Sequence, residues 1–74
     1  MENFTGEVVR VDGRGFGIIR MRDSIDEAKH AFFTENTSNY NKVGSRLKLG
    51  AGVEGLVKKT RQKVLPVVEF ITVE

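Results

Sequence analysis

The chain has 74 residues, of which 39% are hydrophobic and 30% charged, a composition typical of a folded domain and too apolar for a disordered tail. It contains no cysteine, which excludes disulfides and thiolate metal sites, and so short a chain leaves little room for a buried active site. We therefore expect neither an enzyme nor a cofactor. The net charge is only +2, so the distribution of the basic residues, rather than their excess, bears on binding partners.

One domain spanning residues 1–74 is expected, because no repeat, low-complexity run or linker interrupts the sequence. The start of the chain shows no basic segment leading into an apolar run, and no apolar stretch approaches the length of a membrane span. We therefore expect a cytoplasmic protein that does not contact a membrane.

A β-hairpin is predicted near the beginning of the chain. Residues 6–11 and 14–21 are rich in β-branched side chains, and Asp12-Gly13 between them suits a two-residue turn that requires positive φ. The acidic stretch 23–29 that follows is expected to be a loop. The apolar run over residues 30–34 predicts a third strand.

Two further strands are predicted after the turn-rich segment 36–41. Leucines alternate with basic residues and are followed by glycines, a pattern that predicts a long, kinked fourth strand over residues 46–57. The last strand is predicted over residues 64–73, with Pro66 near its start or on an edge. Five strands without a helix indicate an all-β fold, a small antiparallel barrel that is closed or nearly closed.

The second predicted strand has two faces of different chemistry, because side chains alternate along a strand. One face carries Arg14, Phe16, Ile18 and Arg20, and the other carries Gly15, Gly17, Ile19 and Met21. Cations beside an aromatic ring suit single-stranded nucleic acid, since the ring stacks on any base while arginines contact phosphates or stack in turn. In the alternative interpretation, Phe16 and Ile18 belong to the core and the arginines only bracket the strand.

The third strand bears on this choice. By the same alternation, Ala31 and Phe33 share one face, while His30, Phe32 and Thr34 share the other. If Phe32 lies beside Phe16 on the outside of the barrel, the two rings form a platform. If both rings are buried, there is no platform.

Two segments resemble the ribonucleoprotein motifs of cold-shock domains. Arg14-Gly15-Phe16-Gly17-Ile18-Ile19 is similar to the family's Lys-Gly-Phe-Gly-Phe-Ile, and Ala31-Phe32-Phe33-Thr34-Glu35 is similar to its Val-Phe-Val-His-Phe. The similarity extends upstream over residues 6–12 and downstream over residues 43–47, and residues 50–74 align weakly. The resemblance implies a five-stranded antiparallel OB-fold barrel that binds single-stranded RNA or DNA through aromatic side chains of its second and third strands.

The resemblance also implies roles for individual residues: Arg14 replaces the motif lysine, Phe16 matches the first stacking phenylalanine, and Phe32 matches the phenylalanine of the second motif. The departures are Arg10 for a tryptophan, Ile18 for a phenylalanine, Thr34 for a histidine and Glu35 for a phenylalanine. Because rings are missing, we expect weaker or differently directed binding, with arginine partly substituting for them.

Other residues have two open interpretations. Lys58, Lys59 and Arg61 belong to a basic loop between the last two strands that either meets a phosphate backbone or is a solvated turn. Tyr40 either stacks on a base or caps the barrel. His30 is the only histidine and has no second nitrogen or sulfur ligand to accompany it, so we expect no metal or catalytic role.

The sequence thus predicts a module that binds single-stranded RNA or DNA, as a monomer or weak homodimer. The candidate binding residues are Arg10, Arg14, Phe16, Ile18, Arg20, His30, Phe32, Thr34, Lys58, Lys59 and Arg61. The alternative is a protein-interaction module that keeps the barrel with weak or no nucleic-acid binding.

Overall fold

The computed structural model of the chain describes residues 2–22, 29–58 and 66–74. The acidic loop expected at residues 23–29 lies outside this part of the chain except for Lys29, and so does the basic loop except for Lys58. Within the described ranges, no helix is long and apolar enough to cross a membrane.

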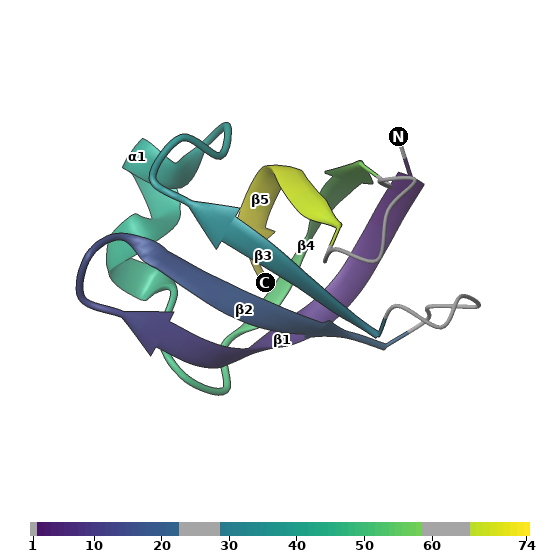
Figure 1. Cartoon of the computed structure of the whole chain (residues 1–74), viewed down its shortest axis with the longest axis horizontal. Helices are drawn as coiled ribbons and strands as arrows, with labels where there is room; N and C mark the ends of the chain where they lie inside the picture. The colour runs from purple at the N-terminus through teal and green to yellow at the C-terminus, as the bar shows by residue number, and fades with distance from the viewer. Residues whose placement is uncertain (1, 23–28, 59–65) are drawn as a thin grey trace.

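The described residues form five strands that close into a barrel (Figure 1). The strands are β1 (Glu2–Asp12), β2 (Phe16–Met21), β3 (His30–Thr34), β4 (Gly52–Lys58) and β5 (Val67–Val73). Their order around the barrel is β1-β2-β3-β5-β4, and β4 returns to pair with β1. The predicted all-β barrel is therefore confirmed, and its strand order is compatible with an OB-fold.

The expectation of a purely antiparallel barrel is wrong, because β3 and β5 run parallel. These two strands are separated in the chain by β4 and by a short helical segment. The local sequence pattern of each strand therefore does not indicate the direction in which they pair. The other neighbouring strands are antiparallel, and the barrel is mixed.

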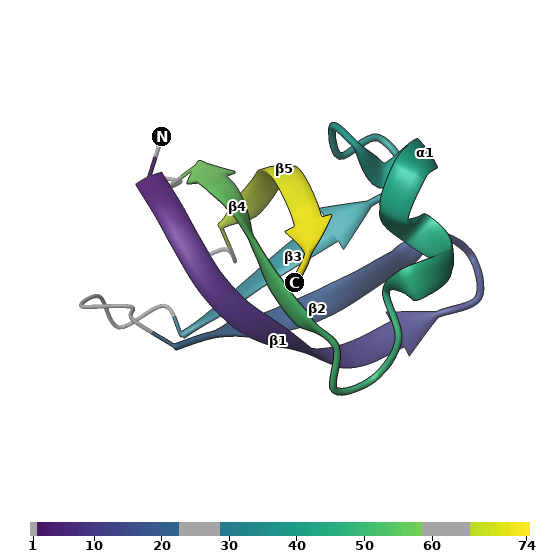
Figure 2. The ribbon, with the colours of Figure 1, turned by 180° about the vertical axis from the view of Figure 1, so that it is seen from behind.

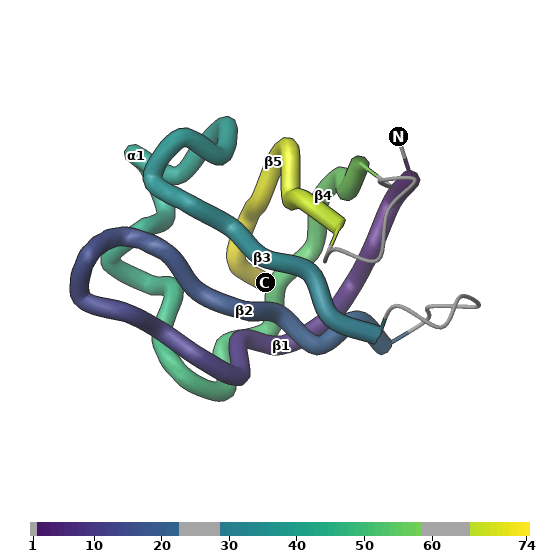
Figure 3. Tube along the Cα trace, viewed as in Figure 1, coloured from purple at the N-terminus to yellow at the C-terminus, as the bar shows by residue number. Residues whose placement is uncertain are grey.

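Strand β1 is longer than predicted and pairs on both sides. Its first half pairs with β4 and its second half with β2, as the view from behind shows (Figure 2). The register with β2 shifts between Val8 and Arg10, which marks Val9 as a bulge. A bulge bends a strand and increases its twist, and the trace of β1 curves along its length (Figure 3). This curvature allows one strand to belong to both sides of the barrel.

The turn between β1 and β2 differs from the predicted two-residue turn. The Gly15 N–H donates a hydrogen bond to the Asp12 carbonyl at 3.1 Å, and Asp12 lies opposite Phe16. The loop is therefore residues 13–15, and Gly15 closes it with a φ of 92°, a conformation that favours glycine. As a result β2 begins at Phe16, and Arg14 belongs to the turn rather than to the strand.

A short helical segment replaces the beginning of the predicted fourth strand. Helix α1 (Tyr40–Val43) and the 3-10 turn η1 (Gly44–Arg46) lie at the end of the barrel near the β1–β2 turn (Figures 1 and 2). Leu47 is buried, but Leu49 is 70% exposed, so the alternation of leucines and basic residues was not that of a strand. The last strand, predicted over residues 64–73 with Pro66 near its start or on an edge, begins at Val67 in the structure, and Pro66 comes directly before it.

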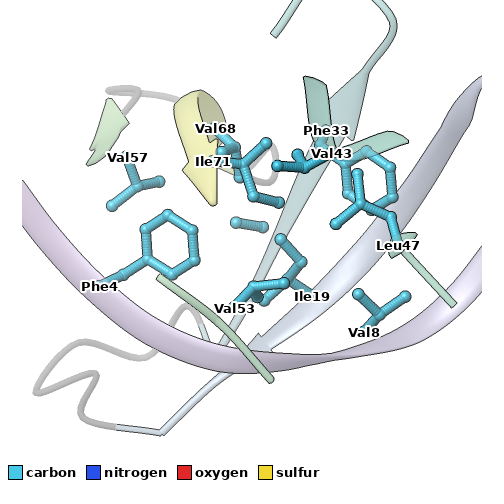
Figure 4. Close-up of a cluster of buried hydrophobic side chains, with 11 residues drawn as sticks. Phe4, Val8, Ile19, Phe33, Val43, Leu47, Val53, Val57, Val68 and Ile71 are labelled. Carbon is cyan, nitrogen blue, oxygen red and sulfur yellow. The ribbon is translucent and has the colours of Figure 1, made fainter. Parts of the chain in front are cut away.

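The core fills the barrel with aliphatic side chains and two phenylalanine rings (Figure 4). Its buried members are Phe4, Val8, Ile19, Ala31, Phe33, Val43, Leu47, Val53, Val57, Val68 and Ile71. Tyr40 packs against this cluster, with its ring centroid 6.3 Å from that of Phe33. Of the two interpretations of Tyr40, the structure therefore favours the cap at the barrel end.

The seam between β3 and β5 is completed by side chains of the segment that follows β3. The buried Thr37 hydroxyl donates to the Val68 carbonyl at 3.1 Å and accepts the Thr34 N–H at 3.0 Å. Asn39 donates from its side-chain amide to the Ile71 carbonyl at 2.9 Å. These bonds satisfy backbone groups that would otherwise be buried without a partner.

Candidate functional site

The outer faces of β1, β2 and β3 bring most of the predicted binding residues onto one surface. Strand pairing places Phe16 opposite Thr34, Ile18 opposite Phe32, and Arg20 opposite His30. On the other side of β2, Arg10 lies opposite Ile18, and Asp12 lies opposite Phe16. Because directly opposed residues of paired strands share a face, these side chains lie together on the outside of the barrel.

The burial of neighbouring residues confirms which face is inside. Gly17 and Ile19 of β2 are buried, as are Ala31 and Phe33 of β3. The alternate residues Phe16, Ile18 and Phe32 are only partly buried. Of the two arrangements left open by the sequence, the structure has the one in which Phe16 and Phe32 face outward.

These residues surround an open hollow of about 460 Å³, which we call the outer pocket. It is lined by Arg10, Arg14, Gly15, Phe16, Ile18, Phe32, Thr34, Glu35 and Asn36. Apolar side chains of β2 and β3 form its centre, and charged and polar groups surround them. An outward-facing apolar surface with two aromatic rings has no role in closing the core, so it is available to a ligand.

Arg14 lies over one of the two rings. Its guanidinium carbon is 5.4 Å from the centroid of Phe16, which is within the range of a cation–π contact. Asp12 holds it there, because the Asp12 carboxylate accepts hydrogen bonds from the Arg14 backbone N–H at 2.8 Å and from Nε at 3.1 Å. The hydrogen bond from the Arg14 side chain, together with that from its backbone, lowers the pKa of Asp12 below its ordinary value. The turn thus fixes a guanidinium at the edge of the aromatic surface.

The arginines on this surface differ in their partners. Arg20 forms an ion pair with Glu7, and Arg14 is paired with Asp12. Among the described residues, no hydrogen bond or ion pair engages the exposed side chain of Arg10, whose charge acts on Asp12 without direct contact. Arg10 is therefore the cation of the outer pocket that is most available to a phosphate.

The remaining predicted residues lie away from the outer pocket or outside the described ranges. Arg20 and His30 share the outer face but do not line the pocket, and Lys58 is exposed at the end of β4. Lys59 and Arg61 are not among the described residues. In the described part of the chain, no group of three or more histidine, aspartate or glutamate side chains is placed to hold a metal ion.

Three residues of the outer pocket were not among the sequence-predicted binding residues: Gly15, Glu35 and Asn36. The pairing of Phe16 with Thr34 explains why they lie there, since the residues after Thr34 continue past the first residue of β2 toward the β1–β2 turn. A carbon added at Gly15 would lie 3.3 Å from Oε2 of Glu35, so the Glu35 carboxylate lies directly over this glycine. Gly15, Glu35 and Asn36 could have been predicted to line the pocket only if the register between β2 and β3 had been known.

Comparisons of the chain with protein-family models, with curated proteins and with solved structures found no match. Residues 14–19 and 31–35 lie on β2 and β3 and on the turns at their ends, and their outward residues meet in the outer pocket. Function is therefore inferred from the chemistry of this pocket.

Proposed function

We propose that this protein binds single-stranded RNA or DNA through the outer pocket. The observation that carries the proposal is the gathering of two outward phenylalanine rings and two arginines around one open hollow. Proteins that bind single strands combine aromatic rings, on which bases stack, with cations that follow the backbone. The resemblance of the β2 and β3 segments to cold-shock motifs supports the same activity.

Each side chain has a role that follows from its place. Phe16 and Phe32 offer ring faces to successive bases, and Ile18 between them supplies apolar contact. Arg10, whose exposed side chain forms no hydrogen bond or ion pair in the described ranges, contacts phosphate. Arg14, which Asp12 holds over Phe16, extends the stacking surface with its guanidinium group.

The proposal is tested by fluorescence anisotropy with a labelled, unstructured oligonucleotide of about eight nucleotides, within the range that one OB-fold covers. Loss of a stacking ring typically costs about 1–3 kcal/mol, so Phe16→Ala and Phe32→Ala are each expected to weaken binding roughly five- to 150-fold. Leu49→Ala is the matched control, because it removes an exposed apolar side chain outside the pocket. Binding should also weaken as salt concentration rises.

Two results would overturn the proposal. One is the absence of binding at low salt to both RNA and DNA. The other is equal affinity of the Phe16→Ala, Phe32→Ala and Leu49→Ala variants when circular dichroism shows that all three are folded.

A second candidate function is a protein-interaction module. Apolar side chains outside the outer pocket are also exposed, notably Val11 at 46% and Leu49 at 70%, and exposed apolar groups can contact a protein partner. A backbone-amide titration separates the two functions. If an oligonucleotide leaves the resonances of β2 and β3 unchanged, the protein-interaction function is favoured.

A further inference from the structure

One feature of the outer pocket does not suit a simple phosphate-binding surface: it contains a carboxylate. Glu35 lines the pocket and its Oε2 lies over Gly15, the residue directly before Phe16. Within the described ranges, no hydrogen bond or ion pair engages Glu35, although Arg14 lines the same pocket. Arg14 is already held by Asp12, which leaves the Glu35 carboxylate free to accept hydrogen bonds from a ligand.

The place of this carboxylate indicates which part of a nucleotide it meets. A carboxylate repels phosphate, so Glu35 would weaken binding if the backbone passed beside it. The edge of a base carries N–H donors and no charge, and an ionised carboxylate accepts two such donors at once. A base stacked on Phe16 has its plane on the ring and its edge toward the surrounding polar groups. We therefore expect Glu35 to meet the edge of a base.

Guanine is the base whose edge fits this group. Its Watson–Crick edge presents two adjacent donors, N1–H and the 2-amino group, which match the two oxygens of a carboxylate. Adenine and cytosine present one donor beside an acceptor nitrogen, and uracil and thymine present one donor between two acceptor oxygens. Each of these other bases would place an acceptor against a carboxylate oxygen, which is unfavourable.

The rest of the pocket also suits guanine. The O6 atom of guanine accepts hydrogen bonds. Two donors line the same pocket, the side-chain amide of Asn36 and the guanidinium of Arg10. A purine also offers more stacking area than a pyrimidine to Phe16. We infer that Glu35 makes the outer pocket select guanine, an inference that rests on the proposed function.

The test uses uridine octanucleotides that carry one central guanine, inosine or adenine, titrated by fluorescence anisotropy at low salt. Inosine lacks only the 2-amino group of guanine and therefore removes one of the two donors. A hydrogen bond to a charged group contributes enough binding free energy that the guanine strand is expected to bind roughly tenfold more tightly than the inosine strand. The adenine strand, which presents an acceptor to the carboxylate, should bind no more tightly than the inosine strand.

Glu35→Gln is the decisive variant, because a side-chain amide has one oxygen and cannot accept both donors. It should reduce the preference for guanine over inosine to about twofold or less. Glu54→Gln is the matched control: it makes the same change of charge at an exposed position of β4 outside the pocket, and the preference should remain.

The outcomes distinguish this inference from the proposed function. If the three strands bind the native protein equally, or if Glu35→Gln tightens all three by the same factor and keeps their order, guanine selection by Glu35 is wrong while nucleic-acid binding stands. If no strand binds at low salt, the proposed function fails, and guanine selection fails with it.

Discussion

Phe32 and Phe33 are adjacent in the chain and identical in chemistry, yet they belong to different regions of the molecule. Phe33 faces inward, is 2% exposed and belongs to the same core cluster as Val43 and Leu47 (Figure 4). Phe32 faces outward and lines the outer pocket. Strand alternation alone therefore separates a ring that stabilises the barrel from a ring that is available to a ligand.

The residues opposite the two rings differ in the same way. Phe33 lies opposite Gly17, and a carbon added at Gly17 would come within 2.5 Å of the Phe33 ring. Phe32 lies opposite Ile18, whose side chain remains partly exposed beside it. The inner face is filled so closely that a carbon added at Gly17 would meet the Phe33 ring, whereas the outer face is left open. We therefore expect substitutions on the inner face to reduce stability, and substitutions on the outer face to affect ligand binding more than stability.

The largest expected effect comes from Phe33→Ala. Loss of a buried phenylalanine typically costs about 3–5 kcal/mol, a large part of the stability of a small domain. Phe32→Ala should cost about 1 kcal/mol or less, because its ring is only partly buried. Urea denaturation followed by circular dichroism measures both.

If Phe33→Ala does not fold, Phe33→Leu provides an intermediate measurement. Equal losses of stability for substitutions at positions 32 and 33 would contradict the conclusion that only the inner ring stabilises the barrel.

A smaller effect is expected from Gly17→Ala. The added carbon would lie 2.4 Å from the Arg10 carbonyl oxygen and would also meet the Phe33 ring. Either the backbone or the ring has to shift, which should lower the free energy of unfolding by roughly 1–3 kcal/mol. Gly13→Ala is the matched control, because no atom lies within 4 Å of the added carbon in the turn. Thermal denaturation should show a lower midpoint for Gly17→Ala only. A Gly17→Ala variant as stable as Gly13→Ala would show that the inner face is less tightly filled than described.

The smallest effect is expected from Asp12→Asn on the outer face. Hydrogen bonds from Arg14 lower the pKa of Asp12 in the folded state. The stability that these bonds contribute is therefore fully present above the ordinary aspartate pKa of 3.8. It is lost as pH falls through the lower, folded-state value. The difference in stability between the native protein and Asp12→Asn should therefore be constant near neutral pH and disappear in acid. Urea denaturation across this pH range tests this, and a difference that grows in acid would contradict it.

The sequence was sufficient to predict which residues of β2 and of β3 share a face, because the pattern of each strand is local. Half-buried strands alternate with a period of two, and Phe16 and Phe32 follow that period without interruption. Their two possible orientations could not be separated by alternation alone, because rings of the same kind occupy both faces of β3. The burial of Phe33 and Ala31 resolved this choice.

The features that could not be predicted depend on contacts between distant parts of the chain or on backbone conformation. Leu47 is buried at the end of a helical segment and Leu49 is exposed, but over so few residues their spacing looked like that of a strand. Arg14 was assigned to β2 because the pattern does not reveal that Gly15 adopts positive φ. Glu35 was considered only as a missing phenylalanine, because its position over Gly15 follows from the β2–β3 register.

The parallel seam between β3 and β5 bears on how the barrel assembles. Strands β1, β2 and β3 pair with their neighbours in the chain, whereas β3 and β5 are separated in the chain by α1, η1 and β4. Pairing over a short chain segment is faster than closing a long loop, so the surface of β1–β3 is expected to form before the barrel closes. Until then the edges of β3 and β5 are open to another chain. The hydroxyl of Thr37, which bridges these strands in the finished barrel, is thus part of what protects the protein against strand exchange and aggregation.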